Sequence, residues 1–220
     1  MNILDVLGPV MIGPSSSHTA GAVRLGKMAR AVFGGLPEAA DMTLYGSFAQ
    51  TYQGHGTDVA LVAGLLGWNT DDARIPQSFQ AAREAGLAVR FLPETDVVPP
   101  HPNTVRFHLR GENREISLTG ISVGGGQICL TEIDGFAVEA TGAFPCLLTV
   151  HEDKPGVVAL VSSVLSNVGV NIAQMRVSRR QKGGVAVMLV ETDQAVEAHT
   201  LAALEKLPHV QQARAIPPVV

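Results

Sequence analysis

The sequence of 220 residues predicts a mixed α/β (α+β) chain with two domains, residues 1–142 and 145–220. Three observations support this prediction. Apolar residues make up 46% of the chain, enough to fill a buried core. Segments with helical periodicity and segments with strand-like alternation both occur in the first domain. From about residue 145 the segments follow the complete order β-α-β-β-α-β.

The first domain begins with a predicted helix from Ser17 to about Phe33, in which Ala22, Leu25 and Ala29 fall at helical spacing. Ser, His and Thr stand where the N-cap of this helix belongs. The next elements are a strand at MTLYGSF (42–48), a short apolar helix opened by Thr57 or Asp58, a third helix from Pro76 to Ala85 and a strand at LAVRFLP (87–93).

Four alternating runs complete the first domain and predict an antiparallel meander. They are separated by the turn sequences GEN, GGG and DG, and they cover residues 104–110, 114–123, 127–133 and 136–142. A proline-rich loop, VVPPHPN (97–103), connects the helical half of the domain to this meander. The three glycines at 124–126 precede no helix, so a phosphate-binding loop is not indicated there.

The second domain is predicted to be a ferredoxin-like split β-α-β fold. Pro155 marks the start of its first helix and Gly169 lies just past the end. Its predicted strands are 146–152, 170–179, 184–192 and 210–216, and its predicted helices are 155–169 and 193–207.

Charge and composition exclude several classes of function. Sixteen Lys and Arg against 20 Asp and Glu give a net charge of −4, without the basic excess of a nucleic-acid surface. Gly8 and Pro9 interrupt the first apolar stretch before it reaches the length of a signal peptide or a membrane span. We therefore expect a cytoplasmic protein that binds no nucleic acid and no membrane. Cys129 and Cys146 stand alone, so we expect two reduced thiols and no metal site on this chain.

The stretch LTVHEDKPGVVALVSSVLSNVGVNI (148–172) resembles an ACT domain of the amino-acid-binding kind, especially the serine-sensing domain of phosphoglycerate dehydrogenases. The resemblance implies self-association of subunits and a bound amino acid. Asp153 can accept a hydrogen bond from an ammonium group, and free amides near Gly156 can face a carboxylate. Alternatively, Asp153 only caps the helix and His151 packs at the sheet edge. The implied ligand-binding residues are His151, Asp153, Gly156, Asn171 and Ile172.

Three further segments place histidines in loops or at helix starts, where reactive side chains can converge. They are GPSSSHTAG with His18, QGHGTD with His55 and HPNT with His101. Together with GPVMIGPSSSHTAGAVRLG, LYGSFAQTYQGHGTDVALV, VVPPHPNTVRF and LTGISVGGGQI, they resemble the β subunit of iron–sulfur-dependent L-serine dehydratase over essentially the whole chain. The first domain is also similar to the allosteric-substrate-binding domain of some phosphoglycerate dehydrogenases.

The resemblance implies an L-serine ammonia-lyase, which converts L-serine to pyruvate and ammonia in amino-acid metabolism and gluconeogenesis. The chain would be active only with an α subunit, in a heterodimer or heterotetramer. The α subunit would hold a [4Fe-4S] cluster, since two isolated cysteines cannot anchor one. Pyridoxal phosphate is not expected.

Elimination of water from serine requires a base for the Cα proton and donors that fix the carboxylate. His55, between Gly54 and Gly56, is the leading candidate for the base, because an imidazole keeps a neutral nitrogen near pH 7. His18 is the second catalytic candidate. Its neighbours are predicted to form a carboxylate cradle, unless they are a plain serine-rich cap. The candidate substrate-binding residues are Ser15, Ser16, Ser17, His101 and Asn103.

Two other functions remain open. The chain can be a regulatory amino-acid-binding subunit without catalytic residues, in which the histidine loops have no chemical role. A fragment of a phosphoglycerate-dehydrogenase-like enzyme is the third reading, against which stands the missing nucleotide-binding half.

Overall fold

A computed structural model describes residues 9–219 of the chain. Contacts divide the protein into two compact units between Gly135 and Phe136, a few residues before the predicted boundary at 142–145. Within residues 9–219, no helix is long and apolar enough to cross a membrane.

In the first unit, the larger sheet has the strand order β2-β1-β3-β4-β5, and β6 falls within the second unit. β1 runs parallel to β2 and antiparallel to β3, and β3, β4 and β5 pair antiparallel in sequence, as the meander predicted. The turn between β4 and β5 contains Gly124, Gly125 and Gly126, all with positive φ. The strands are β1 Ala39–Tyr45, β2 Ala88–Glu94, β3 Asn103–Gly111, β4 Arg114–Gly124, β5 Gln127–Ile133 and β6 Phe136–Ala140.

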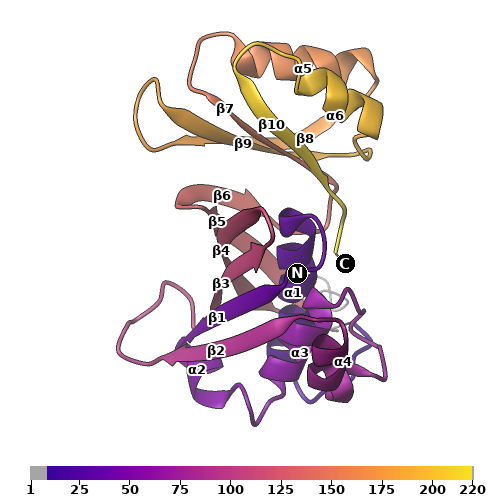
Figure 1. The fold of residues 1–220 in the computed structure, drawn as a ribbon, viewed down its shortest axis with the longest axis vertical. Helices are drawn as coiled ribbons and strands as arrows, with labels where there is room; N and C mark the ends of the chain where they lie inside the picture. Colours follow the sequence, from indigo (N-terminus) through magenta and orange to yellow (C-terminus); the bar gives the residue numbers. More distant parts are fainter. Residues whose placement is uncertain (1–8, 220) are drawn as a thin grey trace. The chain divides into compact units, whose positions relative to one another are not determined.

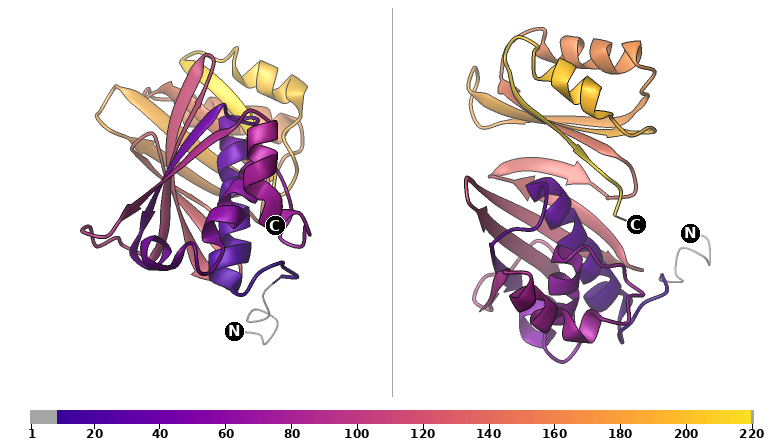
Figure 2. Two further views of the ribbon diagram at one scale, coloured as in Figure 1. Left: turned by 60° about the horizontal axis from the view of Figure 1, so that its bottom comes forward. Right: turned by 45° about the vertical axis from the view of Figure 1, so that its right-hand side comes forward.

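The helices α1, α3 and α4 gather on one face of this sheet (Figure 2). The buried side chains of β3, Val105, Phe107 and Leu109, alternate with polar ones, which is why one face of the sheet takes the helices. A short π-helix (η2, Ser16–Ala20) leads directly into α1, and a 3₁₀ turn (η3, Ile75–Gln77) leads into α4. The helices are α1 Gly21–Phe33, α2 Gly46–Thr51, α3 Thr57–Leu65 and α4 Ser78–Glu84.

One predicted element of the first unit is wrong at its end. The strand expected over 42–48 stops at Tyr45, and the next residues form α2. Gly46 has a φ of 56° and lies so close to the loop before β3 that a Cβ there would come within 2.6 Å of the Pro102 carbonyl oxygen. Glycine therefore lets the chain turn from strand to helix beside the HPN segment.

Helices α1 and α3 meet through two glycines. A Cβ on Gly26 would lie 2.3 Å from the Leu61 carbonyl oxygen, and a Cβ on Gly64 would lie 2.1 Å from the Val23 carbonyl oxygen. The two backbones therefore approach more closely than any larger residue would permit. The Thr19 hydroxyl, just before α1, donates a hydrogen bond to the His55 carbonyl, just before α3. This bond shows that the N-terminal ends of both helices lie at the same end of the crossing.

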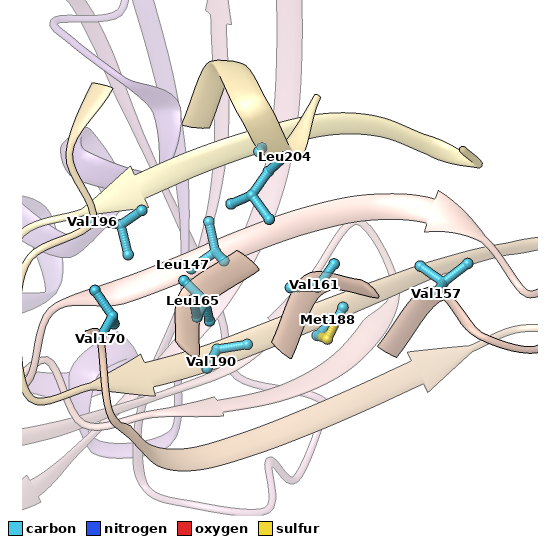
Figure 3. Close-up of a cluster of buried hydrophobic side chains, with 10 residues drawn as sticks. Leu147, Val157, Val161, Leu165, Val170, Met188, Val190, Val196 and Leu204 are labelled. Atoms are coloured by element: carbon cyan, nitrogen blue, oxygen red, sulfur yellow. The ribbon is translucent and has the colours of Figure 1, made fainter. Parts of the chain in front are cut away.

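The second unit has the strand order β10-β7-β9-β8, which the predicted β-α-β-β-α-β order requires. Both of its helices lie on one face of this sheet (Figure 1). Apolar side chains from α5, α6 and the sheet form its core, including Val161, Leu165 and Met188 (Figure 3). Its elements are β7 Cys146–Glu152, α5 Val157–Asn167, β8 Ile172–Arg179, β9 Val185–Thr192, α6 Ala198–Leu204 and β10 Val210–Ile216.

We expect Gly26→Ala and Gly64→Ala each to lower the free energy of unfolding by about 1–3 kcal/mol, because the added methyl group must force the two helix backbones apart. Urea denaturation measures this change. Gly54→Ala is the matched control, since a Cβ there meets nothing closer than 3.7 Å. A loss for the control equal to that for the two crossing glycines would contradict the steric explanation.

Candidate active site

The serine-rich segment forms the start of the first helix. Ser15 is its N-cap, and the Ser15 hydroxyl accepts a hydrogen bond from the His18 amide at 3.2 Å. The Gly21 amide bonds the carbonyl of Ser16, which gives this first turn its π character. The capping role that sequence reasoning left open is therefore present, and it also fixes the position of the His18 side chain.

The His18 imidazole is held at both nitrogens by hydroxyl groups. Nδ1 lies 3.1 Å from the Ser17 Oγ and 3.5 Å from the Ser15 Oγ, and Nε2 lies 3.0 Å from the Ser47 Oγ. The residue is only 8% exposed. Burial, reinforced by the nearby His55, holds the pKa of His18 below its usual value. The ring is therefore predominantly neutral at pH 7, with its orientation fixed by hydroxyls that can donate or accept.

The His55 ring stands edge-on to the His18 ring, with centroids 4.8 Å apart. His55 lies in the turn between α2 and α3 and is exposed. Of its two flanking glycines, only Gly56 needs to be glycine for its backbone, with a φ of 66°, since nothing crowds Gly54. No hydrogen-bond partner for the His55 ring nitrogens exists among residues 9–219, so both nitrogens are left unoccupied by other side chains.

The HPN segment reaches the same region through Gly46. The Asn103 amide N–H donates to His101 Nδ1 at 3.2 Å, and the Asn103 side chain donates to the Ser122 carbonyl at 3.4 Å. Asn103 also forms an isolated bridge with Gly46, the residue before Ser47. Asn103 is thus connected through Gly46 and Ser47 to the His18 ring, whereas no direct contact joins His101 to either His18 or His55 among the described residues.

Buried polar atoms without partners surround this cluster. Among the described residues they include the Thr57 hydroxyl, the Asn103 side-chain carbonyl and the Ser122 hydroxyl. Thr57 follows the His55 turn, and the Ser122 side chain packs against Gly21, where a Cβ would lie 2.1 Å from the Ser122 Oγ. Buried polar groups normally have partners, so these atoms have hydrogen-bonding capacity that residues 9–219 do not use.

The structure brings together four of the predicted residues, Ser15, Ser17, His18 and His55. The Ser16 hydroxyl forms no hydrogen bond with this group within residues 9–219. Sequence reasoning missed Ser47, whose hydroxyl bonds His18. Its only sequence signal is its position directly after a strand and a glycine, and that signal was hidden by the predicted continuation of the strand.

In the second unit, the predicted ligand residues have other partners. The Asp153 carboxylate accepts hydrogen bonds from Arg179 and from the Gly183 amide, so it ties down the β8–β9 hairpin and caps no helix. These two bonds, the amide first, hold the pKa of Asp153 below its usual range. The Asn171 side chain donates to Asp193 at 2.7 Å, and Ile172 begins β8.

Two predicted ligand residues of that unit, His151 and Gly156, have an unpartnered atom or open space beside them. His151 is buried, its Nδ1 is 2.8 Å from the Glu152 carbonyl, and its Nε2 has no partner among the described residues. The Thr149 hydroxyl, two residues earlier on β7, is also buried and unpartnered. Gly156 precedes α5 with a φ of 93°, and open space surrounds the position of its missing Cβ.

The two cysteines do not fit the ligand set of an iron–sulfur cluster. They lie in different units, Cys129 on β5 and Cys146 on β7, and neither is in a disulfide within the described residues. Burial, with help from Glu191, raises the pKa of the Cys146 thiol to about 12, so the thiol stays protonated near pH 7. No group of three or more His, Cys, Asp or Glu within residues 9–219 is arranged to hold a metal.

Comparisons with known proteins match both units. The family model of the serine dehydratase beta chain matches residues 3–132, and the ACT domain model matches residues 147–209. The chain is 48% identical to the probable L-serine dehydratase beta chain of Bacillus subtilis over 96% of each protein. It is 37% identical to the L-serine dehydratase beta chain of Peptoniphilus asaccharolyticus over 86% of each. A D-3-phosphoglycerate dehydrogenase from a Synechocystis species is 26% identical, and the match covers 87% of this chain but 35% of that protein.

We expect the stability of the chain to fall as the pH drops below 6.5 in part because of His18, whose pKa is lowered in the fold. The unfolded chain then binds the proton more tightly than the folded chain does, so acid favours unfolding. His18→Gln removes this contribution and should give a flatter pH dependence of the free energy of unfolding than the parent. His199→Gln, on the exposed face of α6, is the control and keeps the parent slope. Identical slopes for the parent and His18→Gln would refute the assignment.

Proposed function

Because this chain belongs to the serine dehydratase beta-chain family, we propose that it is the beta chain of an L-serine dehydratase, which converts L-serine to pyruvate and ammonia together with an alpha chain. The observation that carries the proposal is the convergence of His18 and His55, 37 positions apart in the sequence, at a ring distance of 4.8 Å. The hydroxyl of Thr57, which follows the His55 turn, is buried and has no partner among residues 9–219.

His55 is the proposed base. It is exposed, its ring nitrogens are unoccupied among the described residues, and its backbone is held by the Thr51 carbonyl and the Thr19 hydroxyl. A neutral imidazole in this position can take the Cα proton of serine. The Cα–H bond breaks, the proton goes to the imidazole, and the electron pair forms the new double bond as hydroxide leaves.

His18 and the serine turn are proposed to hold the substrate carboxylate. The first amides of a helix lack intrahelical partners and face an anion favourably. The hydroxyls of Ser15, Ser17 and Ser47 fix the orientation of the His18 ring, so the single N–H of the neutral imidazole is held in place. His101 and Asn103 are proposed to orient the substrate from the HPN segment, through the Gly46 bridge.

Stabilisation of the leaving hydroxide is assigned to the alpha chain. The cysteines of this chain do not fit cluster ligation, so the [4Fe-4S] cluster that the family resemblance implies belongs, in this proposal, to that partner. The second unit is proposed to associate with a second copy of itself and to bind a small amino acid.

A purely regulatory function is the second candidate. It is favoured by the unpartnered His151 Nε2 and Thr149 hydroxyl in the ACT unit, which indicate a ligand there as well. In that case the histidine pair of the first unit serves no chemistry.

The test is His55→Ala in a complex reconstituted with the alpha chain and assayed with L-serine without oxygen. Loss of a general base should lower kcat by about 10²–10⁴-fold, while gel filtration shows the complex still assembled. His199→Ala is the matched control with unchanged kcat. An unchanged kcat in His55→Ala, with only the apparent affinity for serine altered, would favour the regulatory function.

A further inference from the structure

A cavity of about 310 Å³ lies on the larger sheet, on the face away from α1. Gly120 of β4 faces α1, because a Cβ there would meet the Leu25 side chain at 2.6 Å. Its neighbour Thr119 lines the cavity, and successive residues of a strand point to opposite faces. This cavity is therefore separate from the cluster around His18, which lies at the start of α1.

Strand register puts a cation and an anion into this cavity. Arg106 of β3 pairs with Thr119 of β4, and Thr119 pairs with Glu132 of β5. The three residues thus form one row across the sheet, and all three line the cavity. With neighbouring strands about 4.8 Å apart, the backbones of Arg106 and Glu132 lie about 10 Å apart, with Thr119 between them.

Neither charge is neutralised within the described chain. The side chains of Arg106 and Glu132 form no ion pair and no hydrogen bond with any of residues 9–219, and the Thr119 hydroxyl is likewise unpartnered there. Elsewhere on the same face charges do pair, as Arg90 and Arg110 do with Asp41. Across the three strands, the row therefore presents a guanidinium, then a hydroxyl, then a carboxylate, and the hydroxyl lies between the two charges.

Apolar walls give this row the character of a binding site rather than of a solvated surface. The loop that connects β2 to β3 supplies Val97, Val98, Pro99 and Pro100 to the rim. Apolar walls around a few polar groups are typical of small-molecule sites, and the volume is at the lower end of their range. Such walls also strengthen the electrostatic attraction between the cavity and a charged ligand.

We propose that this cavity binds a small zwitterionic α-amino acid. Arg106 holds the carboxylate through the paired N–H groups of its guanidinium, and Glu132 accepts hydrogen bonds from the ammonium group. The Thr119 hydroxyl bonds the ligand between them. The site goes beyond the proposed dehydratase reaction, because it shares no residue with the histidine cluster.

The ligand would contact the loop that also carries the HPN segment. Thr104 lines the cavity, and its hydroxyl donates to the His101 carbonyl at 2.6 Å. A bound amino acid would therefore lie beside the segment that carries His101 and Asn103.

The test is a titration of the full chain with L-serine, followed by the amide resonances of Thr104, Thr119 and Thr131 in two-dimensional NMR. We expect saturable shifts at these three threonines. Ethanolamine, which lacks the carboxylate, and 3-hydroxypropionate, which lacks the ammonium group, should bind at least about tenfold more weakly, because each loses one charge-assisted contact. His55→Gln should keep the shifts, so failure of the dehydratase proposal is distinguishable from failure of this one.

Charge variants separate the two ends of the ligand. Arg106→Gln should weaken L-serine binding at least about tenfold. Glu132→Gln should weaken L-serine but not 3-hydroxypropionate, so that the two affinities converge. Arg83→Gln on α4 and Glu112→Gln in the β3–β4 turn, both exposed, are the matched controls. The absence of saturable shifts, or equal losses in the control variants, overturns the proposal.

Discussion

The close crossing of α1 and α3 is the constraint on which the candidate active site depends. Gly26 and Gly64 let the two backbones touch, with neither position able to carry a Cβ at the present separation. The helices run in the same direction, so their first turns lie side by side. His18 precedes one helix and His55 precedes the other, and their rings therefore meet at 4.8 Å. The chemistry proposed for this chain rests on a contact between two residues that have no side chains.

The electrostatics of the histidine pair follow from its unequal burial. His18 is enclosed by the hydroxyls of Ser15, Ser17 and Ser47, and burial lowers its pKa, so the ring stays neutral and fixed. His55 is exposed beside it. A second positive charge next to an imidazolium is unfavourable, so the nearby His55 adds to the effect of burial in keeping His18 neutral. Two identical side chains thereby take different roles.

The polar groups of the first unit are divided between the two faces of one sheet. On the helix side, the Ser122 and Asn103 atoms without partners lie near the serine turn. On the other side, Arg106 and Glu132 face a cavity across Thr119. The loop between β2 and β3 reaches both, because Val97 to Pro100 line the cavity and His101 to Asn103 follow directly. A single proline-rich segment therefore connects two sites of different chemistry.

Local patterns in the sequence determined the secondary structure, because the side-chain periods of helices and strands are properties of short segments. The order of elements in the second unit, the meander and the placement of His18 and His55 at helix starts all followed from them. The strand end at Tyr45 did not, since it depends on the contact of Gly46 with Pro102 from a distant loop. Only the tertiary structure decided that Ser47 holds His18, that Asp153 binds Arg179 and caps no helix, and that Arg106 and Glu132 share one row. These are pairings between segments far apart in the chain, and they are fixed by packing and register, which no local pattern contains.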